Sequence, residues 1–228
     1  MLWVPRVDEV PMSLSRIDHN GICGVMVERV GEATKALHNL EKGQTLGIRG
    51  PFGNHFQLVK GRALLVSGGM GIAPLIPLGK SLRNLGTRVE FACGAKTSAN
   101  FCGLETVREV VEEDKLCLAT DDGSLGSRGF VTSILPSIFE TEEIDMVYCC
   151  GPEPMMKSVF HLTEKYGLPL QASMERIIKC SVGLCGNCMI GKYRVCKDGL
   201  VLTSEQLREV ADEFGVYRRG FDGRKIPF

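Results

Sequence analysis

Residues 63–75 read ALLVSGGMGIAPL, and this stretch decides the fold. The apolar run Ala63–Ser67 is typical of a buried strand, and the glycines that follow predict a tight turn into a helix at Leu75–Leu85. Glycine lets a backbone approach a pyrophosphate, and a helix N-terminus attracts its negative charge. The stretch therefore predicts a nucleotide-binding turn. Its spacing is not the standard G-x-G-x-x-G, so a plain tight turn is the alternative.

The segments on either side repeat the strand–helix alternation. Strands are expected at Val89–Cys93, Leu116–Thr120 and Met146–Cys150, and helices at Leu104–Glu113, Phe130–Phe139 and Met155–Tyr166. Such alternation indicates a parallel sheet flanked by helices. We expect residues 59–168 to form this α/β domain.

A second glycine-bearing turn follows the strand Met146–Cys150. Ligands of open α/β sheets bind outside the carboxyl ends of the strands, so the two turns should line one crevice. The residues expected to contact a nicotinamide nucleotide there are Gly68, Gly69, Gly71, Cys150, Gly151 and Pro152. Cys150 is either a small core residue or a sulfur beside the nicotinamide ring.

Four cysteines near the C-terminus have the spacing Cys180-x4-Cys185-x2-Cys188-x7-Cys196. A C-x4-C-x2-C loop with a more distant fourth cysteine is the plant-type [2Fe–2S] spacing. The loop also contains Gly183, Gly186 and Gly191, which permit left-handed backbone and bring N–H groups close to sulfur. A structural zinc site is the alternative, although zinc usually takes its cysteines as two short, separated pairs. Four unrelated buried thiols are a further alternative.

The composition excludes several other classes. The 228 residues carry no net charge and only one tryptophan, which argues against nucleic-acid binding. The longest apolar stretch, Ala63–Gly79, is broken by glycines and prolines and cannot form a membrane helix. The start lacks the features of a signal peptide, and the ten cysteines are not spaced as disulfide staples. We therefore expect a reducing, cytoplasmic location.

The two ends of the chain differ from the middle. Residues 1–58 show short strand candidates at Met1–Val4, Gly24–Val30 and Thr45–Arg49. Residues 169–228 hold the cysteine loop, then a helix starting near Ser204 with Thr203 and Gln206 at capping-box spacing. A basic, glycine-broken tail, Tyr217–Phe228, closes the chain. We expect the apolar loop residues Val182, Leu184 and Met189, with this tail nearby, to form a contact patch for another protein. The alternative is that these residues pack under the loop and the tail is a solvated end.

Three motifs occur here in the order found in the ferredoxin–NADP reductase-like superfamily. They are Gly47-Ile-Arg-Gly-Pro-Phe-Gly53, the Gly68–Leu75 turn, and Cys150-Gly151-Pro152. The resemblance is narrowed to one family by two further features, Met174-Glu175-Arg176 and the cysteine loop. From end to end, the sequence resembles the family of electron-transfer subunits of the NAD-dependent, type B dihydroorotate dehydrogenase.

This resemblance implies three parts: an FAD-binding β-barrel in residues 1–58, an NAD-binding α/β domain in 59–168, and a small [2Fe–2S] domain in 169–228. It implies a subunit that passes electrons from a dihydroorotate dehydrogenase catalytic subunit, through [2Fe–2S] and FAD, to NAD in pyrimidine (UMP) biosynthesis. The implied assembly is a heterotetramer of two copies of each subunit, without nucleic acid or membrane. The implied flavin residues are Pro11, Met12, Ser13, Val27, Glu28, Arg29, Ala33 and Thr34, although a plain barrel strand is the alternative for Val25–Val30.

The sequence departs from the family in two places. The family's Arg-Pro-x-Ser motif appears here as Val10-Pro11-Met12-Ser13, without its arginine, and family members carry more strands before the segment matching Met1–Pro5. A barrel without those strands has an open edge, so we expect weak FAD binding by the chain alone.

Two other functions stay open. One is an NAD(P)H-linked diaphorase subunit of a hydrogenase or ferredoxin:NADP oxidoreductase, and the other is a zinc-stabilised nucleotide-binding regulator. No side chain reads as a general base, because His19, His38, His55 and His161 lack a partnered nucleophile in the sequence pattern. Any redox chemistry therefore belongs to cofactors.

Overall fold

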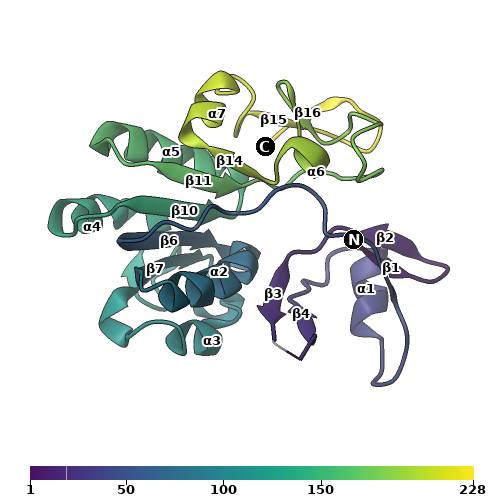
Figure 1. Ribbon diagram of the computed structural model, residues 1–228, viewed down its shortest axis with the longest axis horizontal. Helices are drawn as coiled ribbons and strands as arrows, with labels where there is room; N and C mark the ends of the chain where they lie inside the picture. The colour runs from purple at the N-terminus through teal and green to yellow at the C-terminus, as the bar shows by residue number, and fades with distance from the viewer. Residues whose placement is uncertain (19) are drawn as a thin grey trace.

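The structure is a computed structural model that describes residues 1–18 and 20–228. His19, one of the four histidines considered above, lies outside the described residues. A large sheet with helices forms one side of the molecule, a small β region containing the N-terminus lies beside it, and the C-terminal segment covers one end of the sheet (Figure 1). The two smaller parts lie on the same side of the sheet, and Arg49 of one donates a hydrogen bond to Ser181 of the other.

The large sheet has the strand order β14-β11-β10-β6-β7-β8-β9. Neighbours from β11 to β9 run parallel, and only β14 is antiparallel, to β11. The strands are β6 (Arg62–Gly68), β7 (Arg88–Ala95), β8 (Leu116–Thr120), β9 (Ser127–Arg128), β10 (Met146–Cys150), β11 (Leu170–Ser173) and β14 (Val201–Thr203).

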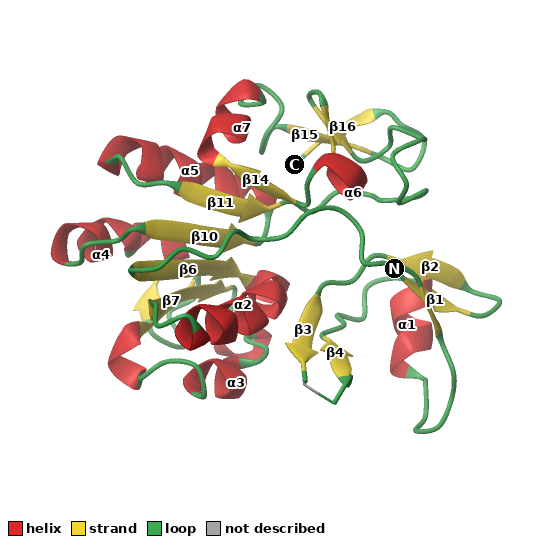
Figure 2. Cartoon of the chain, viewed as in Figure 1, coloured by secondary structure: helices red, strands yellow, loops and turns green. Residues whose placement is uncertain are grey.

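Helices cover both faces of this sheet (Figure 2). Leu64 and Val66 of β6 face a core shared with α4 (Leu135–Thr141) and α5 (Glu153–Tyr166). Ala63 and Leu65 face the other core, shared with α2 (Ile72–Asn84) and α3 (Leu104–Arg108). Burial on both faces explains why β6 reads as a continuous apolar run.

The strand and helix predictions for the middle of the chain are confirmed. The expected strands Leu116–Thr120 and Met146–Cys150 have the observed bounds, and β6 and β7 extend theirs by one or two residues. The helix expected at Leu104–Glu113 ends at Arg108, and the one expected at Phe130–Phe139 begins only at Leu135. At α7 (Ser204–Glu209) the capping box forms, because Thr203 accepts the N–H of Gln206 and Gln206 accepts that of Thr203.

The sheet continues past the expected boundary at residue 168. Strands β11 and β14 belong to the predicted cluster segment but extend the nucleotide-binding sheet. Cys188 and Cys196 of the cysteine loop also belong to the same buried core as Val147 and Leu170. The cluster segment and the α/β part therefore share one core. The four-residue strand β11 was too short to show in the sequence pattern.

Residues 1–58 form small elements. Strands β1 (Leu2–Val4), β2 (Asp8–Val10) and β5 (Gly47–Ile48) make an antiparallel sheet in the order β2-β1-β5. A separate hairpin joins β3 (Leu14–Ile17) to β4 (Cys23–Val25), and the unexpected helix α1 (Glu32–His38) follows. Strand β4 is shorter than the expected Gly24–Val30. Within the described residues these strands form separate sheets instead of a closed barrel.

The C-terminal segment contains β12 (Met189–Ile190), β13 (Tyr193–Arg194) and α6 (Val195–Asp198). The C-terminal tail folds into a hairpin of β15 (Tyr217–Arg219) and β16 (Lys225–Pro227), two strands that the sequence pattern did not indicate. The ammonium of Lys179 donates to the carbonyl of Phe221, so the hairpin lies against the start of the cysteine loop. Across the described residues, no helix is long and apolar enough to cross a membrane.

Candidate functional site

The two predicted nucleotide turns touch each other at the carboxyl edge of the sheet. Their strands, β6 and β10, are parallel neighbours with Ser67 opposite Cys150. A Cβ on Gly71 would overlap the carbonyl oxygen of Cys150, and one on Gly68 would lie 2.5 Å from Met155 Sδ. Gly68 and Gly71 are therefore needed so that the two turns can pack together.

Gly69 has a different role from its neighbours. Its φ of +52° is in the left-handed region, and a Cβ there would meet no atom within 4 Å. Gly69 is exposed and begins the short 3-10 turn Gly69–Gly71, which leads into α2, whose N-terminus carries partial positive charge. Of the three predicted glycines, Gly69 is the one whose backbone faces open space, as contact with a pyrophosphate requires.

Cys150 lies at the end of β10 with a half-buried side chain, whereas its neighbour Cys149 is fully buried. Burial raises the pKa of the Cys150 thiol to about 12, and the carboxylate of Glu175 raises it further, while Ser173 on β11 opposes the shift. The thiol therefore stays protonated at neutral pH. It can pack against a bound ring but cannot act as a nucleophile.

The four predicted cluster cysteines come together as two pairs. Cys180 Sγ accepts the backbone N–H groups of Leu184 and Cys185, each at 3.4 Å, and Cys188 Sγ accepts that of Cys196 at 3.5 Å. Within the described residues, no three His, Cys, Asp or Glu side chains converge as a site for one metal ion would require. Two separate pairs suit a [2Fe–2S] cluster, in which each iron takes two thiolates.

The electrostatics of the two cysteine pairs differ. Backbone N–H groups of Cys185, Val182 and Leu184 lower the pKa of Cys180 to about 6. Burial, followed by the neighbouring Cys188, raises the pKa of Cys196 to about 11. N–H groups aimed at sulfur stabilise a ligating thiolate, so the first pair is prepared for iron by its own loop.

The loop backbone has the conformation that the sequence predicted. Gly183, Gly186 and Gly191 have φ values of +77°, +69° and +50°. Arg194 anchors the loop, because it donates two hydrogen bonds of 2.8 Å to Asp198 and a longer one to the carbonyl of Gly183. These donors and soft ligands fit a [2Fe–2S] cluster.

One side of the loop is open to solvent. Cys185 is exposed, whereas Cys188 and Cys196 are buried. Val182 is 48% exposed and Leu184 is 84% exposed, and Phe221 of the C-terminal hairpin is 73% exposed. We call these three residues the loop patch. Met189, which we also expected at the surface, is half-buried in β12.

The predicted flavin residues divide into two groups. Ala33 and Thr34 are buried at the start of α1, where the Thr34 hydroxyl accepts the N–H groups of Val30 and Gly31. The carbonyl of Val27 accepts a hydrogen bond from His38, and Met12 is half-buried. The exposed members are Pro11, Ser13, Glu28 and Arg29.

Arg29 fits a phosphate-bearing cofactor better than the motif position Val10 does. Among the described residues its guanidinium has no ion pair or side-chain hydrogen bond. A free guanidinium is suited to bidentate contact with a phosphate. Arg29 shares this property with the exposed Arg6, which also has no ion pair or side-chain hydrogen bond among the described residues.

Sequence reasoning missed the segment that ties residues 1–58 to the sheet. Asn54 and the backbone of Val201 exchange two hydrogen bonds of 2.8 and 2.7 Å. Gln57 is bonded to the side chain of Gln171, and the hydroxyl of Tyr148 donates to the Gln57 carbonyl. Asn54 directly follows the Gly47–Gly53 motif, so the sequence showed the motif but not the residues with which this segment pairs.

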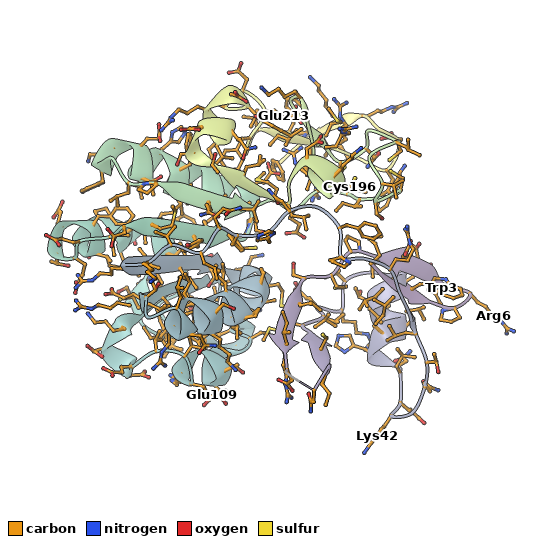
Figure 3. The ribbon with its side chains drawn as sticks, in the orientation of Figure 1. Trp3, Arg6, Lys42, Glu109, Cys196 and Glu213 are labelled. Atoms are coloured by element: carbon orange, nitrogen blue, oxygen red, sulfur yellow. The ribbon has the colours of Figure 1, made fainter. Side chains whose placement is uncertain are left out.

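A buried ion network was also missed, although the sequence pointed to Arg176. Arg176 pairs with Glu153 at 2.5 Å and with Glu213 at 3.3 Å, and all three side chains are almost fully buried. Glu153 begins α5 directly after the Cys150–Pro152 turn, and Glu213 also accepts the N–H of Gly191. Figure 3 shows Glu213 and Cys196 in the same C-terminal part of the molecule. The network links the nucleotide turn to the cysteine segment.

Two family models match this chain, one over the nucleotide turns and one over the cysteine loop. Residues 65–161 match the oxidoreductase NAD-binding domain, which spans both glycine turns. Residues 175–208 match the iron–sulfur cluster binding domain of dihydroorotate dehydrogenase B, which spans all four cysteines of the loop.

Solved structures share the fold. A structure described as the NADH-dependent reduced ferredoxin-NADP oxidoreductase, in work on flavin-based electron bifurcation, has a TM-score of 0.79 at 28% identity, over 92% of this chain and 78% of that chain. Phthalate dioxygenase reductase, with a TM-score of 0.51 at 22% identity over 67% of this chain and 49% of that chain, shows the same fold.

Curated relatives extend over the whole chain. A protein of Methanocaldococcus jannaschii named "Probable dihydroorotate dehydrogenase B (NAD(+)), electron transfer subunit" is 38% identical over 100% of this chain and 86% of its own length. The protein of the same name from Pyrococcus horikoshii is 42% identical over 98% of this chain and 84% of its own length. The chain belongs to the family of electron transfer subunits of the NAD-dependent dihydroorotate dehydrogenase B.

Proposed function

We propose that this chain passes electrons from a dihydroorotate dehydrogenase catalytic subunit to NAD, through a [2Fe–2S] cluster and FAD, in cytoplasmic pyrimidine (UMP) biosynthesis. One observation carries the proposal. A partly exposed loop with two thiol pairs is joined by one core to the glycine turns of a nicotinamide-binding sheet. A chain built this way can accept electrons from another protein at one end and deliver them to a nucleotide at the other.

The residues of the chain have separate tasks in this function. Cys180, Cys185, Cys188 and Cys196 would hold the cluster, and the Gly69 turn would hold the pyrophosphate of NAD. When bound, the cluster supplies one-electron transfer and the flavin exchanges one electron or a hydride. The protein supplies the binding geometry and the N–H groups that stabilise the thiolates.

Proton chemistry on dihydroorotate is assigned to the partner. His38 donates its Nε2–H to the carbonyl of Val27, and His161 packs beside the ring of Phe160. Neither histidine is therefore placed as a general base toward a substrate at the sheet edge. The catalytic subunit would remove the protons, and this chain would take only the electrons.

The partner would dock on the loop patch. Val182 and Leu184 are exposed apolar residues that lie between Cys180 and Cys185 in the sequence. The exposed basic residues Arg218, Arg224 and Lys225 lie in the adjoining hairpin. We propose a heterotetramer with two copies of each subunit. An apolar centre with a charged rim is the usual composition of a specific protein interface.

The test is co-expression of this chain with a flavin-containing dihydroorotate dehydrogenase subunit. We expect a complex of two copies of each chain on size-exclusion chromatography with light scattering, and reduction of NAD that depends on dihydroorotate. An intact, cluster-bearing chain that neither binds this partner nor supports the coupled reaction would contradict the proposal.

The structural likeness to the ferredoxin-NADP oxidoreductase favours a second candidate, the diaphorase subunit of a ferredoxin- or hydrogen-dependent enzyme. For that candidate the same preparation would reduce NAD(P) with reduced ferredoxin or hydrogenase as donor, and dihydroorotate would be inactive.

A further inference from the structure

The guanidinium of Arg49 bridges the N-terminal sheet and the cysteine loop. It donates two hydrogen bonds to the carboxylate of Glu9, at 2.7 and 2.6 Å, and one of 3.2 Å to the hydroxyl of Ser181. It also lies 5.3 Å from the ring centroid of Phe52. Arg49, Glu9 and Ser181 come from three distant parts of the sequence, so this contact exists only in the folded chain.

Ser181 makes the contact specific to the cluster site. It directly follows Cys180, is 2% exposed, and has a φ of +62°, which is uncommon for a residue other than glycine. The neighbouring backbone N–H groups point at Cys180 Sγ. The buried hydroxyl therefore holds the Arg49 charge beside the first thiolate pair of the predicted cluster.

Glu9 connects the same pair to the predicted flavin site. It lies in the middle of β2, and the Pro11–Ser13 motif begins two residues later. The Glu9 hydrogen bond is the main cause of the raised pKa of Arg49, and the charge of Cys180 contributes as well. The cation between them thus interacts with a carboxylate on the flavin side and a thiolate on the cluster side.

We propose that Arg49 and Glu9 set the reduction potential of the cluster in opposite directions, with Arg49 raising it and Glu9 lowering it. This inference rests on the proposed function, because it requires that the four cysteines bind a [2Fe–2S] cluster. Reduction adds one negative charge to the cluster, and a nearby cation stabilises that charge. Glu9 is a counter-charge that cancels part of this effect.

The competing explanation is a purely structural contact that holds the N-terminal sheet against the loop. The two explanations predict different signs for the shifts in reduction potential. If the Arg49–Glu9 ion pair is only structural, Arg49→Gln and Glu9→Gln each remove the same contact and would move the reduction potential in the same direction. Electrostatic tuning requires that the two substitutions move it in opposite directions.

The experiment is an EPR-monitored redox titration of the full chain with its cluster bound and FAD added in excess. We expect Arg49→Gln to shift the reduction equilibrium about threefold toward the oxidised cluster, a fall of about 28 mV at 59 mV per tenfold for a one-electron couple. Glu9→Gln should raise the potential by a similar amount. Arg49→Lys should stay near the wild type, because it keeps the charge while losing the bidentate geometry.

Arg108→Gln is the matched control, since Arg108 forms a comparable exposed ion pair with Glu113 near α3, away from the cysteine loop. It should leave the potential unchanged. Equal-sign shifts in Arg49→Gln and Glu9→Gln, or no shift in either, would overturn the inference while leaving the proposed function intact. A chain that assembles no iron–sulfur cluster would overturn both.

Discussion

Removing the positive charge from the buried network of Arg176 should destabilise the chain strongly. Arg176 and Glu153 have side chains only 1% exposed, and Glu213 is 9% exposed. In Arg176→Leu both carboxylates lose their shared cation while Gly215 and Gly191 still bond to them through backbone N–H groups. Two uncompensated carboxyl groups would then lie in the core between the nucleotide turn and the cysteine segment.

The expected loss is about 3–5 kcal/mol in the free energy of unfolding, which is the usual cost of breaking a buried ion pair by removing one partner. For a chain of this size, each kcal/mol corresponds to roughly 2–4 °C in melting temperature. Differential scanning calorimetry of the holoprotein should therefore show a fall of roughly 6–20 °C. The control is Arg208→Leu, which removes an exposed bidentate pair with Glu164 and should cost at most about 1 kcal/mol.

The loss should also depend on pH. Burial already raises the pKa of Glu153 above its ordinary value of 4.5, and Arg176 opposes that shift. Without Arg176 the folded-state pKa rises further, so the folded variant takes up a proton more readily than the unfolded chain. The deficit should be complete above the folded pKa and should shrink as pH falls toward 4.5. Equal losses in Arg176→Leu and Arg208→Leu, or a deficit that grows at acidic pH, would refute this reasoning.

Three further outcomes are expected. Cys185→Ser should abolish or strongly alter the EPR signal of the dithionite-reduced cluster, because oxygen replaces a soft thiolate, while Cys102→Ser, outside the loop, should keep it. Gly69→Ala should slow the reduction of bound flavin by NADH at least about tenfold, because a Cβ would project into the space where the pyrophosphate is expected. The control is Gly167→Ala, which places alanine at a similar left-handed φ but far from the nucleotide turns in the sequence, and it should react like the wild type. Leu184→Asp should keep the cluster and NADH–flavin chemistry but lose dihydroorotate-dependent NAD reduction, and normal coupled activity in this variant would remove the loop patch from the interface.

The parts of the fold that the sequence predicted are those with local causes. Strand β10 and the helix after it were visible because Met146–Cys150 is apolar and ends at Gly151 and Pro152. The capping box of Thr203 is also local, since its partner is three residues away. The left-handed glycines of the cysteine loop were expected for the same reason.

The missed parts depend on residues far apart in the chain. Strand β11 is only four residues long and becomes a strand because β10 and β14 lie on either side of it. The basic, glycine-broken tail showed no strand pattern, yet it pairs with itself and lies against Lys179. Arg176 and Arg49 both lie in motifs visible in the sequence, but only the fold brings their carboxylate partners close.

The sequence predicted a tight glycine turn after β6, and the structure has one, but the pattern did not separate the roles of its three glycines. Gly68, Gly69 and Gly71 looked equivalent in sequence, and all three were expected to contact a nucleotide. The structure uses Gly68 and Gly71 to pack the two turns and leaves Gly69 open. That division depends on the position of Met155 and of the Cys150 carbonyl, which no local pattern contains.

The most direct test of the central claim is the metal content of the chain purified without oxygen. Two thiol pairs that hold a [2Fe–2S] cluster predict two irons and two acid-labile sulfides per chain, a brown-yellow colour, and an EPR signal after reduction by one electron. One zinc per chain, with no labile sulfide and no colour, would contradict the account.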